Sequence, residues 1–237
     1  MQDKTNVTEI TGISYSAVLI WNNALNTLPP LSQEFCQTIF GSKSESNYSL
    51  GRNGINVITP PRFKQIDNRL IPQIVPVFQF GFDRMVITSP TLDGLISAYS
   101  KIENEIKKLS FQSLLSVAVM GINIEYEVGF DKGHVQKYLN QRFSAPILDE
   151  NFKDGSVITE LKLSLLESSK DQKVVNITIA PRLADPKKFY IKSNDHYQKV
   201  ASSAFLSMEE LSKYFNESIE KFERKVIPSL NLFNNGK

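Results

Sequence analysis

The chain has very few of the side chains that most often bind metals or form disulfides. Its 237 residues include one cysteine, Cys36, and two histidines, His134 and His196. A lone cysteine excludes an intramolecular disulfide and a cysteine-based zinc site, and it is typical of a protein from the reducing cytoplasm. The histidines are not spaced as a metal-binding pair on a helix, so the sequence predicts no metal site and no bound cofactor.

Strong net charge and long apolar runs are also absent. The 27 basic and 25 acidic side chains leave a formal charge of +2. This balance gives the whole molecule no field that would draw it to nucleic acid or anionic lipid. The most apolar stretch, 114–124, is shorter than the roughly 20 residues of a membrane-spanning helix. The first residues lack the apolar segment of a secretory signal, so we expect a soluble, cytoplasmic protein with no membrane partner.

A globular core, in contrast, is well supplied. Hydrophobic residues make up 41% of the chain and charged residues 22%, as in packed globular proteins. Runs of β-branched and aromatic residues predict strands, and apolar stripes at steps of three and four predict helices. The expected strands cover 13–21, 55–59, 77–82, 84–88, 114–128, 157–166, 173–180 and 189–192. The expected helices cover 31–40, 90–109, 131–143 and 207–226.

Helix ends and loops have local signals of their own. Ser89 is expected to cap the first long helix, with Pro90 in its first position, and Asp131 is expected to cap the helix over 131–143. Ser207 and Glu210 predict a capping box at the start of the last helix. The segment 41–54, rich in Ser, Asn and Gly, is predicted to be a loop. The segment 60–76 is predicted to be irregular because of its prolines.

The order of elements repeats along the chain. Each half is expected to contain a strand, a short helix, further strands and a long helix. We therefore predict an α+β protein of two similar modules in tandem, each a mostly antiparallel sheet covered by one long and one short helix. The modules span 1–110 and 111–237 and pack as one compact unit. Their sheets are expected to join through the long strands 13–21 and 114–128, which would protect two edges.

One resemblance to a known family is carried by two segments. These are the strand through Met120-Gly121-Ile122-Asn123 and the final helix after Asp195-His196-Tyr197. In layout the chain resembles a sporadically distributed bacterial family of uncharacterised two-module proteins. Members of that family carry an arginine early in the strand, where this chain has Val117 to Val119. The resemblance implies the two-module layout and no particular activity.

The sequence contains no recognisable catalytic constellation. It has no glycine-rich nucleotide-binding loop and no nucleophile elbow. Glu125 and Glu127 lie about 7 Å apart if they share one strand face, a separation that also suits glycosidase chemistry. Partnership with cross-strand lysines is the simpler interpretation of this pair. Cys36 is expected to be a packed small residue, so we name no catalytic residue and favour a protein that is not an enzyme.

Two basic segments interleaved with aromatic residues are the main candidates for a binding site. They lie within 52–69 and 182–192, at comparable places in the two halves. Basic side chains beside an aromatic ring suit phosphate contact and base stacking. The candidate contact residues for a nucleic acid or another anion are Arg52, Arg62, Phe63, Lys64, Arg69, Arg182, Lys187 and Lys188.

Three functions are therefore compatible with the sequence. The favoured one is a non-enzymatic binding or assembly protein that acts through its sheet surface, its loops or an oligomer interface, with a protein partner or self-association. The second is nucleic-acid binding by the two basic segments. The third is an enzyme or small-ligand carrier in which a helix closes a cavity over the sheet.

Overall fold

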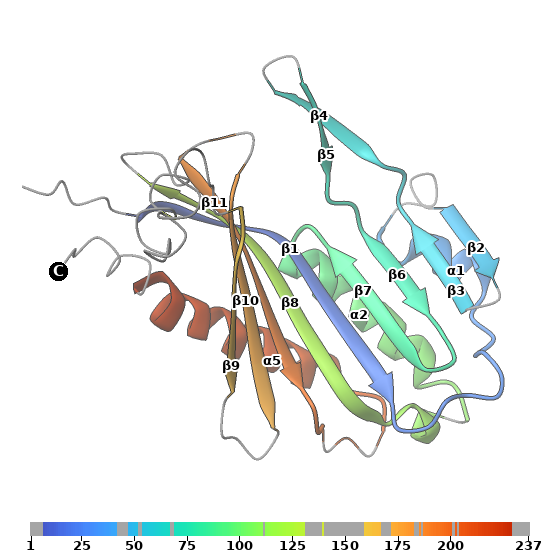
Figure 1. The fold of residues 1–237 in the computed structure, drawn as a ribbon. Coiled ribbons are helices and arrows are strands. Elements are labelled where there is room, and N and C mark those ends of the chain that lie inside the picture. The colour runs from blue at the N-terminus through green and yellow to red at the C-terminus, as the bar shows by residue number, and fades with distance from the viewer. Residues whose placement is uncertain are drawn as a thin grey trace, which may run out of the picture.

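The chain folds around one large antiparallel sheet. The computed structural model describes residues 7–41, 47–51, 54–66, 69–110, 112–130, 139, 159–166, 172–182, 185, 187–200, 202 and 204–228. Nine strands form the sheet in the order β2-β3-β6-β7-β1-β8-β11-β10-β9, and β4 and β5 form a separate two-stranded ribbon (Figure 1). The predicted α+β class is confirmed as a large antiparallel sheet with few helices.

The elements have the following bounds. The strands are β1 (Val7–Trp21), β2 (Asn47–Gly51), β3 (Gly54–Ile58), β4 (Arg62–Ile66), β5 (Arg69–Gln73), β6 (Val77–Phe80), β7 (Arg84–Ser89), β8 (Val117–Phe130), β9 (Leu161–Leu166), β10 (Lys173–Pro181) and β11 (Lys188–Tyr197). The helices are α1 (Gln33–Thr38), α2 (Leu92–Ile106), the 3-10 turn η2 (Gln112–Leu115), α5 (Met208–Lys221) and the π turn η3 (Phe222–Val226) that continues α5.

The two longest strands, β1 and β8, lie side by side in the middle of the sheet. They run antiparallel, with Ala17 opposite Ile122 and Tyr15 opposite Ile124. The other sheet strands that precede residue 110 follow on the β1 side, and those that come later follow on the β8 side. The predicted contact between strands 13–21 and 114–128 is therefore confirmed.

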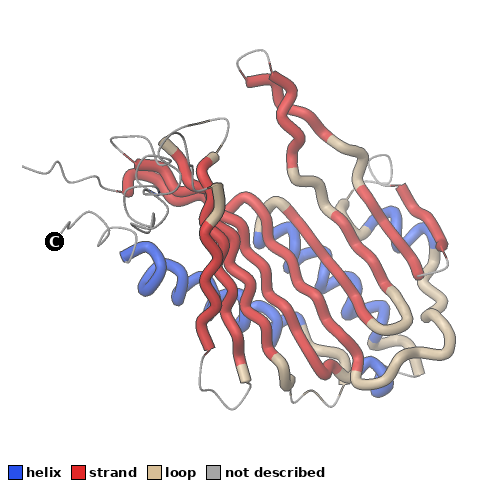
Figure 2. The backbone as a smooth tube through the Cα atoms, in the orientation of Figure 1, coloured by secondary structure: helices blue, strands red, loops and turns tan. Residues whose placement is uncertain are grey.

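Both long helices cover the same face of this sheet (Figure 2). Tyr126 of β8 stacks on Phe222 with ring centres 3.8 Å apart, and Tyr15 of β1 packs against Phe215. Alternate residues along the inner strands point toward this face and most are buried, which gives the contiguous core. We call the opposite side of the sheet the open face, because the described helices lie on the covered side. None of these helices is long and apolar enough to cross a bilayer.

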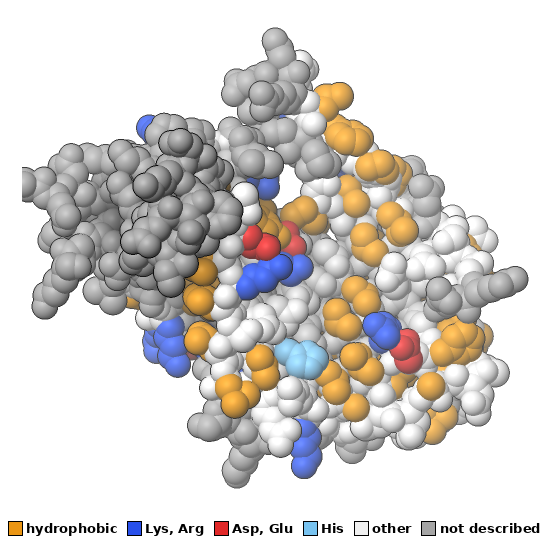
Figure 3. All heavy atoms as spheres, in the orientation of Figure 1, with side chains coloured by type: hydrophobic (Ala, Val, Ile, Leu, Met, Phe, Trp, Pro, Cys, Tyr) orange, Lys and Arg blue, Asp and Glu red, His pale blue; other side chains and the backbone are white. Residues whose placement is uncertain are grey.

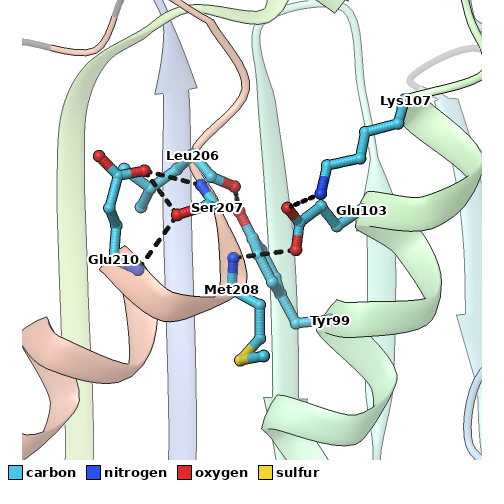
Figure 4. A network of polar contacts seen from close by, with 7 residues as sticks. All are labelled: Tyr99, Glu103, Lys107, Leu206, Ser207, Met208 and Glu210. Carbon is cyan, nitrogen blue, oxygen red and sulfur yellow. Dashed lines mark hydrogen bonds and ion pairs between the residues drawn. The ribbon is translucent and has the colours of Figure 1, made fainter.

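A group of polar contacts ties α2 to the beginning of α5 (Figure 4). The Tyr99 hydroxyl donates to the Leu206 carbonyl at 2.7 Å, and a buried Glu103 oxygen accepts from the Met208 N–H at 3.0 Å. The other Glu103 oxygen pairs with Lys107 at 2.6 Å. The carboxylate thus satisfies a free N–H at the positive end of α5. The predicted capping box of Ser207 and Glu210 is also confirmed.

Two predictions about local structure near the N-terminal half were wrong. Residues 47–51 and 54 belong to β2 and β3, within the segment predicted to be a loop. Pairing with β3 keeps β2 extended despite its Ser and Asn content. The cap of α2 is Thr91, whose hydroxyl accepts from the Gly94 N–H at 3.1 Å. Ser89 instead ends β7, and its hydroxyl accepts from the Thr91 N–H.

The segment 60–76, predicted to be irregular, contains an antiparallel ribbon. Its strands β4 and β5 pair from Arg62 opposite Gln73 to Ile66 opposite Arg69. Pro72 is tolerated in β5 because the ribbon has no further described strand that would need its missing N–H. Figure 1 shows this ribbon, which we call the arm, projecting beyond the end of the sheet.

The remaining predicted strands are confirmed, with changed lengths. The hairpin predicted from 157–166 and 173–180 is the β9–β10 pair. The short strand predicted at 189–192 extends to Tyr197, because polar residues of β11 pair with both β8 and β10. The helix predicted over 131–143 with Asp131 as its cap lies, apart from Leu139, outside the described residues.

Candidate functional site

The open face presents a row of residues with almost no charge. Neighbouring strands align one residue each, in the order Val86, Val18, Gly121, His196, Val174 and Leu166. These residues lie on the strand positions that alternate with the core residues, so they belong to the open face. The only titratable side chain in this apolar row is that of His196. Solvent-facing sheet surfaces usually carry polar side chains, and a row of this composition is therefore suited to contact with another surface.

A second row on the same face, two residues along each strand, carries short hydroxyl and amide groups. It runs through Thr88, Ser16, Asn123, Asn194, Asn176 and Ser164. Two cross-strand hydrogen bonds hold parts of this polar row. Ser164 donates to Asn176 at 2.7 Å, and Asn194 donates to Asn123 at 2.5 Å. The Oδ1 of Asn194 is buried and has no hydrogen-bond donor among the described residues. A buried acceptor without a donor costs free energy until a donor reaches it.

Acidic and basic side chains meet at one end of the open face. Glu127 accepts from Arg182 at 2.8 Å and lies 3.7 Å from Lys188, which is also 3.2 Å from Glu9. Lys192 lies 3.8 Å from Glu125. In Figure 3, acidic and basic side chains adjoin each other on one face of the molecule, near areas of hydrophobic and neutral side chains. The interpretation of Glu125 and Glu127 as partners of basic residues is therefore confirmed.

The charges in this group shift the pKa values of two members. The hydrogen bond from Lys188 lowers the pKa of the Glu9 carboxyl, with a smaller contribution from Thr11. Burial lowers the pKa of Lys188, but its hydrogen bond to Glu9 and the charges of Glu9 and Glu127 outweigh burial and raise it. Both groups stay ionised near neutral pH, so this end of the face carries balanced charge.

The arm supplies an exposed surface of mixed character. Phe63 and Leu70 are 57% and 70% exposed, and Arg62 and Lys64 are exposed on β4. A large exposed phenyl ring on a projecting ribbon is unusual for a purely solvated element. Basic and apolar groups on one ribbon resemble the composition of protein-binding surfaces.

The sequence-derived contact residues fall into three environments. Arg62, Phe63 and Lys64 lie on the arm, and Arg69 lies on its second strand. Arg182 and Lys188 are paired with carboxylates, and Lys187 is exposed at the turn before β11. Arg52 lies outside the described residues. The shared nucleic-acid groove stays a prediction, and two of its basic groups already have acidic partners.

A buried polar cluster, missed by the sequence reasoning, lies between β10, β11 and α5. Lys173 pairs with Asp195 at 2.5 Å and donates to the Tyr197 hydroxyl at 2.8 Å. Ser218 of α5 donates to the same Asp195 oxygen at 2.7 Å. Lys173 and Asp195 are 7% and 1% exposed. Lys173 lies within a predicted strand, at a position that otherwise carries buried apolar side chains, whereas Asp195 lies beyond the predicted strand 189–192.

This cluster has the chemistry of a structural ion pair. Burial lowers the pKa of Lys173, but its bonds to Asp195 and Tyr197 outweigh burial and raise it, so the amine stays protonated. A protonated lysine is no general base, and the buried Ser218 hydroxyl already donates to a carboxylate. Of the groups predicted to be inert, Cys36 is buried, and burial raises its pKa to about 11.

Two further features bear on ligand binding. A hollow of about 420 Å³ is lined by α2 and α5 alone, including Asp93, Ile96 and Asn216. It lies between the helices, whereas a cavity closed over the sheet would also be lined by strand residues. Among the described residues, no group of three His, Cys, Asp or Glu could hold a metal ion.

Comparisons with known proteins do not assign the chain to a family. No protein-family model matches the chain, and no curated protein is similar to it in sequence. The resemblance to a two-module bacterial family stays a prediction. The functional argument therefore depends on the surfaces just described.

Proposed function

We propose that this chain is a non-enzymatic binding or assembly protein that holds another protein on the open face of its sheet. The observation that carries the proposal is the apolar row, in which Val86, Val18, Gly121, His196 and Val174 follow one another across five strands. Protein interfaces are depleted of charge at their centre and polar at their rim. The apolar row and the ion pairs around Glu127 match this distribution.

The polar row supports the same proposal. Two of its cross-strand pairs are hydrogen-bonded, Ser164 to Asn176 and Asn194 to Asn123. Short polar side chains that are held in this way suit the polar part of a protein interface. The arm extends the surface beyond the end of the sheet, with Phe63 and Leu70 as exposed anchors.

We also infer that the two halves of the chain, 1–110 and 111–237, are equivalent modules. Each long central strand pairs with the last strand before its long helix, β1 with β7 and β8 with β11, and further strands follow outward. This order of pairing supports a duplication. If the inference holds, the open face has two related halves that meet at β1 and β8.

The test introduces charge into the apolar row. We expect Val18→Lys together with Val86→Lys to abolish capture of specific proteins from an extract of the source cells, as measured by quantitative mass spectrometry. Phe63→Ala with Leu70→Ala should weaken the same capture. Leu114→Lys is the matched control, because Leu114 is 56% exposed in η2, outside the sheet. If no protein distinguishes the wild type from the double lysine variant, the proposal is wrong.

The same samples separate this function from nucleic-acid binding. Retention on single-stranded RNA or DNA that falls steeply with salt would favour the basic segments instead. In that case, alanine at Arg62, Arg69, Lys187 and Lys188 should remove the retention, whereas the two valine substitutions should not.

A further inference from the structure

The sheet ends at two edge strands, β2 and β9, and β9 is the more apolar of the two, with four leucines among its six residues. β9 pairs with β10 on one side, from Leu161 opposite Ile179 to Leu166 opposite Val174. No described strand pairs with its other side. The outward N–H and C=O groups of such an edge are free to bond to another strand.

The side chains of β9 are those of a buried strand rather than of a solvated edge. Leu163, Leu165 and Leu166 are 38%, 47% and 81% exposed. The strand contains no proline or glycine and one charged residue, Lys162, which pairs with Glu160 at 2.9 Å. Proteins usually guard an edge with charge, proline or a bulge, and β9 has little of this protection.

We propose that β9 binds β9 of a second copy of this chain, antiparallel, about a two-fold axis through Ser164. This proposal concerns the sheet edge and does not rest on the function proposed for the open face. Ser164 has a leucine on either side of it, so the segment Leu163–Leu165 is symmetric about this residue. In this register Leu163 faces Leu165 of the second copy, and Leu165 faces its Leu163. Leu163 and Leu165 of the two copies then cover one another on the helix side of the joined sheet. In a single copy these leucines are exposed.

The charges of the strand favour the same register. Lys162 lies opposite Leu166 of the second copy, so the two Lys162 residues are about 13 Å apart along the strands, four residue steps. This separation exceeds the Debye length of about 8 Å at physiological salt, so their repulsion is screened. An acidic foreign strand, in contrast, would have to compete with Glu160 for Lys162. A closed two-fold dimer also hides both free edges at once.

The first test is the oligomeric state of the full chain as a function of concentration, by analytical ultracentrifugation. A strand of six residues makes a short interface, so we expect a reversible dimer with a dissociation constant on the order of 10 µM. Leu163→Lys with Leu165→Lys should weaken it by at least about tenfold, because four ammonium groups would then meet at the joint. The matched control is Leu50→Lys on the other edge strand, β2, where Leu50 is 66% exposed. That variant should leave the dimer unchanged.

The second test fixes the register. Residues directly opposite in an antiparallel pair have Cα atoms about 4.5–5.5 Å apart, within the range of a disulfide. Ser164→Cys should therefore form a covalent dimer on mild oxidation, whereas Leu166→Cys should not. The native Cys36 is buried, so the wild-type chain gives the background. A chain that stays monomeric at every concentration overturns the proposal. So does a dimer that survives both lysines and forms no disulfide through Ser164→Cys.

Discussion

Lys173 and Asp195 on the covered face, and Arg182 and Glu127 on the open face, are ion pairs of similar length in different surroundings. Their shortest N···O distances are 2.5 Å and 2.8 Å. The side chains of the first pair are 8% and 2% exposed, and those of the second pair 33% and 21%. Burial removes water as an alternative partner, so the first pair must stay together, whereas the second pair can exchange partners with solvent or with another molecule.

The difference in burial indicates that the first ion pair stabilises the fold and that the second is available for binding. The buried pair is bonded further to Tyr197 and Ser218, so that β10, β11 and α5 are joined at one place. The pair on the open face belongs to a group with Lys188 and Glu9 that lies at one end of this face, beyond the polar row. We therefore expect substitutions at the first pair to change stability and substitutions at the second to change association.

The largest expected effect tests the buried pair. Asp195→Ala leaves the Lys173 ammonium buried without its counter-ion, and removes the acceptor of the Ser218 hydroxyl. We expect the free energy of unfolding to fall by about 3–5 kcal/mol, as measured by urea denaturation.

A double variant that removes both charges provides the control for this prediction. Lys173→Met with Asp195→Asn removes both charges and nearly keeps the volume, so it should recover most of the lost stability. If the double variant is as unstable as Asp195→Ala, the loss comes from packing and not from an uncompensated charge. The comparison between the two faces would then fail.

The next prediction concerns alkaline pH, to which the buried cluster should be sensitive. Burial raises the pKa of Tyr197, although Lys173 partly opposes this, and burial also raises the pKa of Tyr126. The pKa of Lys173 is raised as well, because Asp195 and Tyr197 outweigh the burial that lowers it. A group whose pKa is higher in the folded state contributes stability below its unfolded pKa and loses it as the pH rises.

The free energy of unfolding should therefore fall above about pH 10, by about 1.4 kcal/mol per pH unit for each group that keeps its proton only in the folded state. Urea titrations at a series of alkaline pH values, together with the ultraviolet absorbance of phenolate, measure this. Tyr126→Phe and Tyr197→Phe should each make the dependence shallower. A wild-type chain whose tyrosines ionise near pH 10 without unfolding would contradict the prediction.

A smaller effect is expected where the two halves of the chain are tied together. Tyr99→Phe removes the hydroxyl that donates to the Leu206 carbonyl and leaves that acceptor unpaired. We expect a loss of about 1–2 kcal/mol in the free energy of unfolding. Ser207→Ala, which removes the cap of α5 next to this contact, should cost about 1 kcal/mol. If Tyr99→Phe leaves the free energy of unfolding unchanged, the hydrogen bond from Tyr99 of α2 to Leu206 does not help to hold α2 and α5 together.

The sequence was informative where a local rule decides the structure. Ser207 and Glu210 marked the start of α5, and strong β propensity marked β1 and β8. It failed where pairing with a neighbouring strand outweighs local propensity. Residues 47–51 become a strand because they pair with β3, which follows them directly in the sequence. Pro72 fits a strand because the arm has only two described strands.

The same limit applies to the candidate site. The sequence predicted that Glu125 and Glu127 pair with basic side chains, because acidic residues on a solvated strand face attract cross-strand cations. It did not predict which basic residues these are. The apolar and polar rows could not be predicted, since each takes one residue from each of six strands whose registers the sequence does not reveal. The predicted strand 189–192 ends before Asp195, and the burial of Asp195 follows only from the extension of β11 to Tyr197.

The smallest expected effect completes the comparison on the open face. Arg182→Ala removes the 2.8 Å contact to Glu127, but Lys188 remains 3.7 Å from that carboxylate, and water reaches both. We expect a loss of no more than about 1 kcal/mol in the free energy of unfolding, and less at high salt. Arg84→Ala is the matched control, because its pair with Asp83 is more than half exposed and should contribute almost nothing. If Arg182→Ala destabilises the chain as much as Asp195→Ala does, the open-face pair also stabilises the fold, and the contrast between the two ion pairs is wrong. If Arg182→Ala instead weakens capture of the partner and leaves stability unchanged, the charged end of the open face takes part in binding.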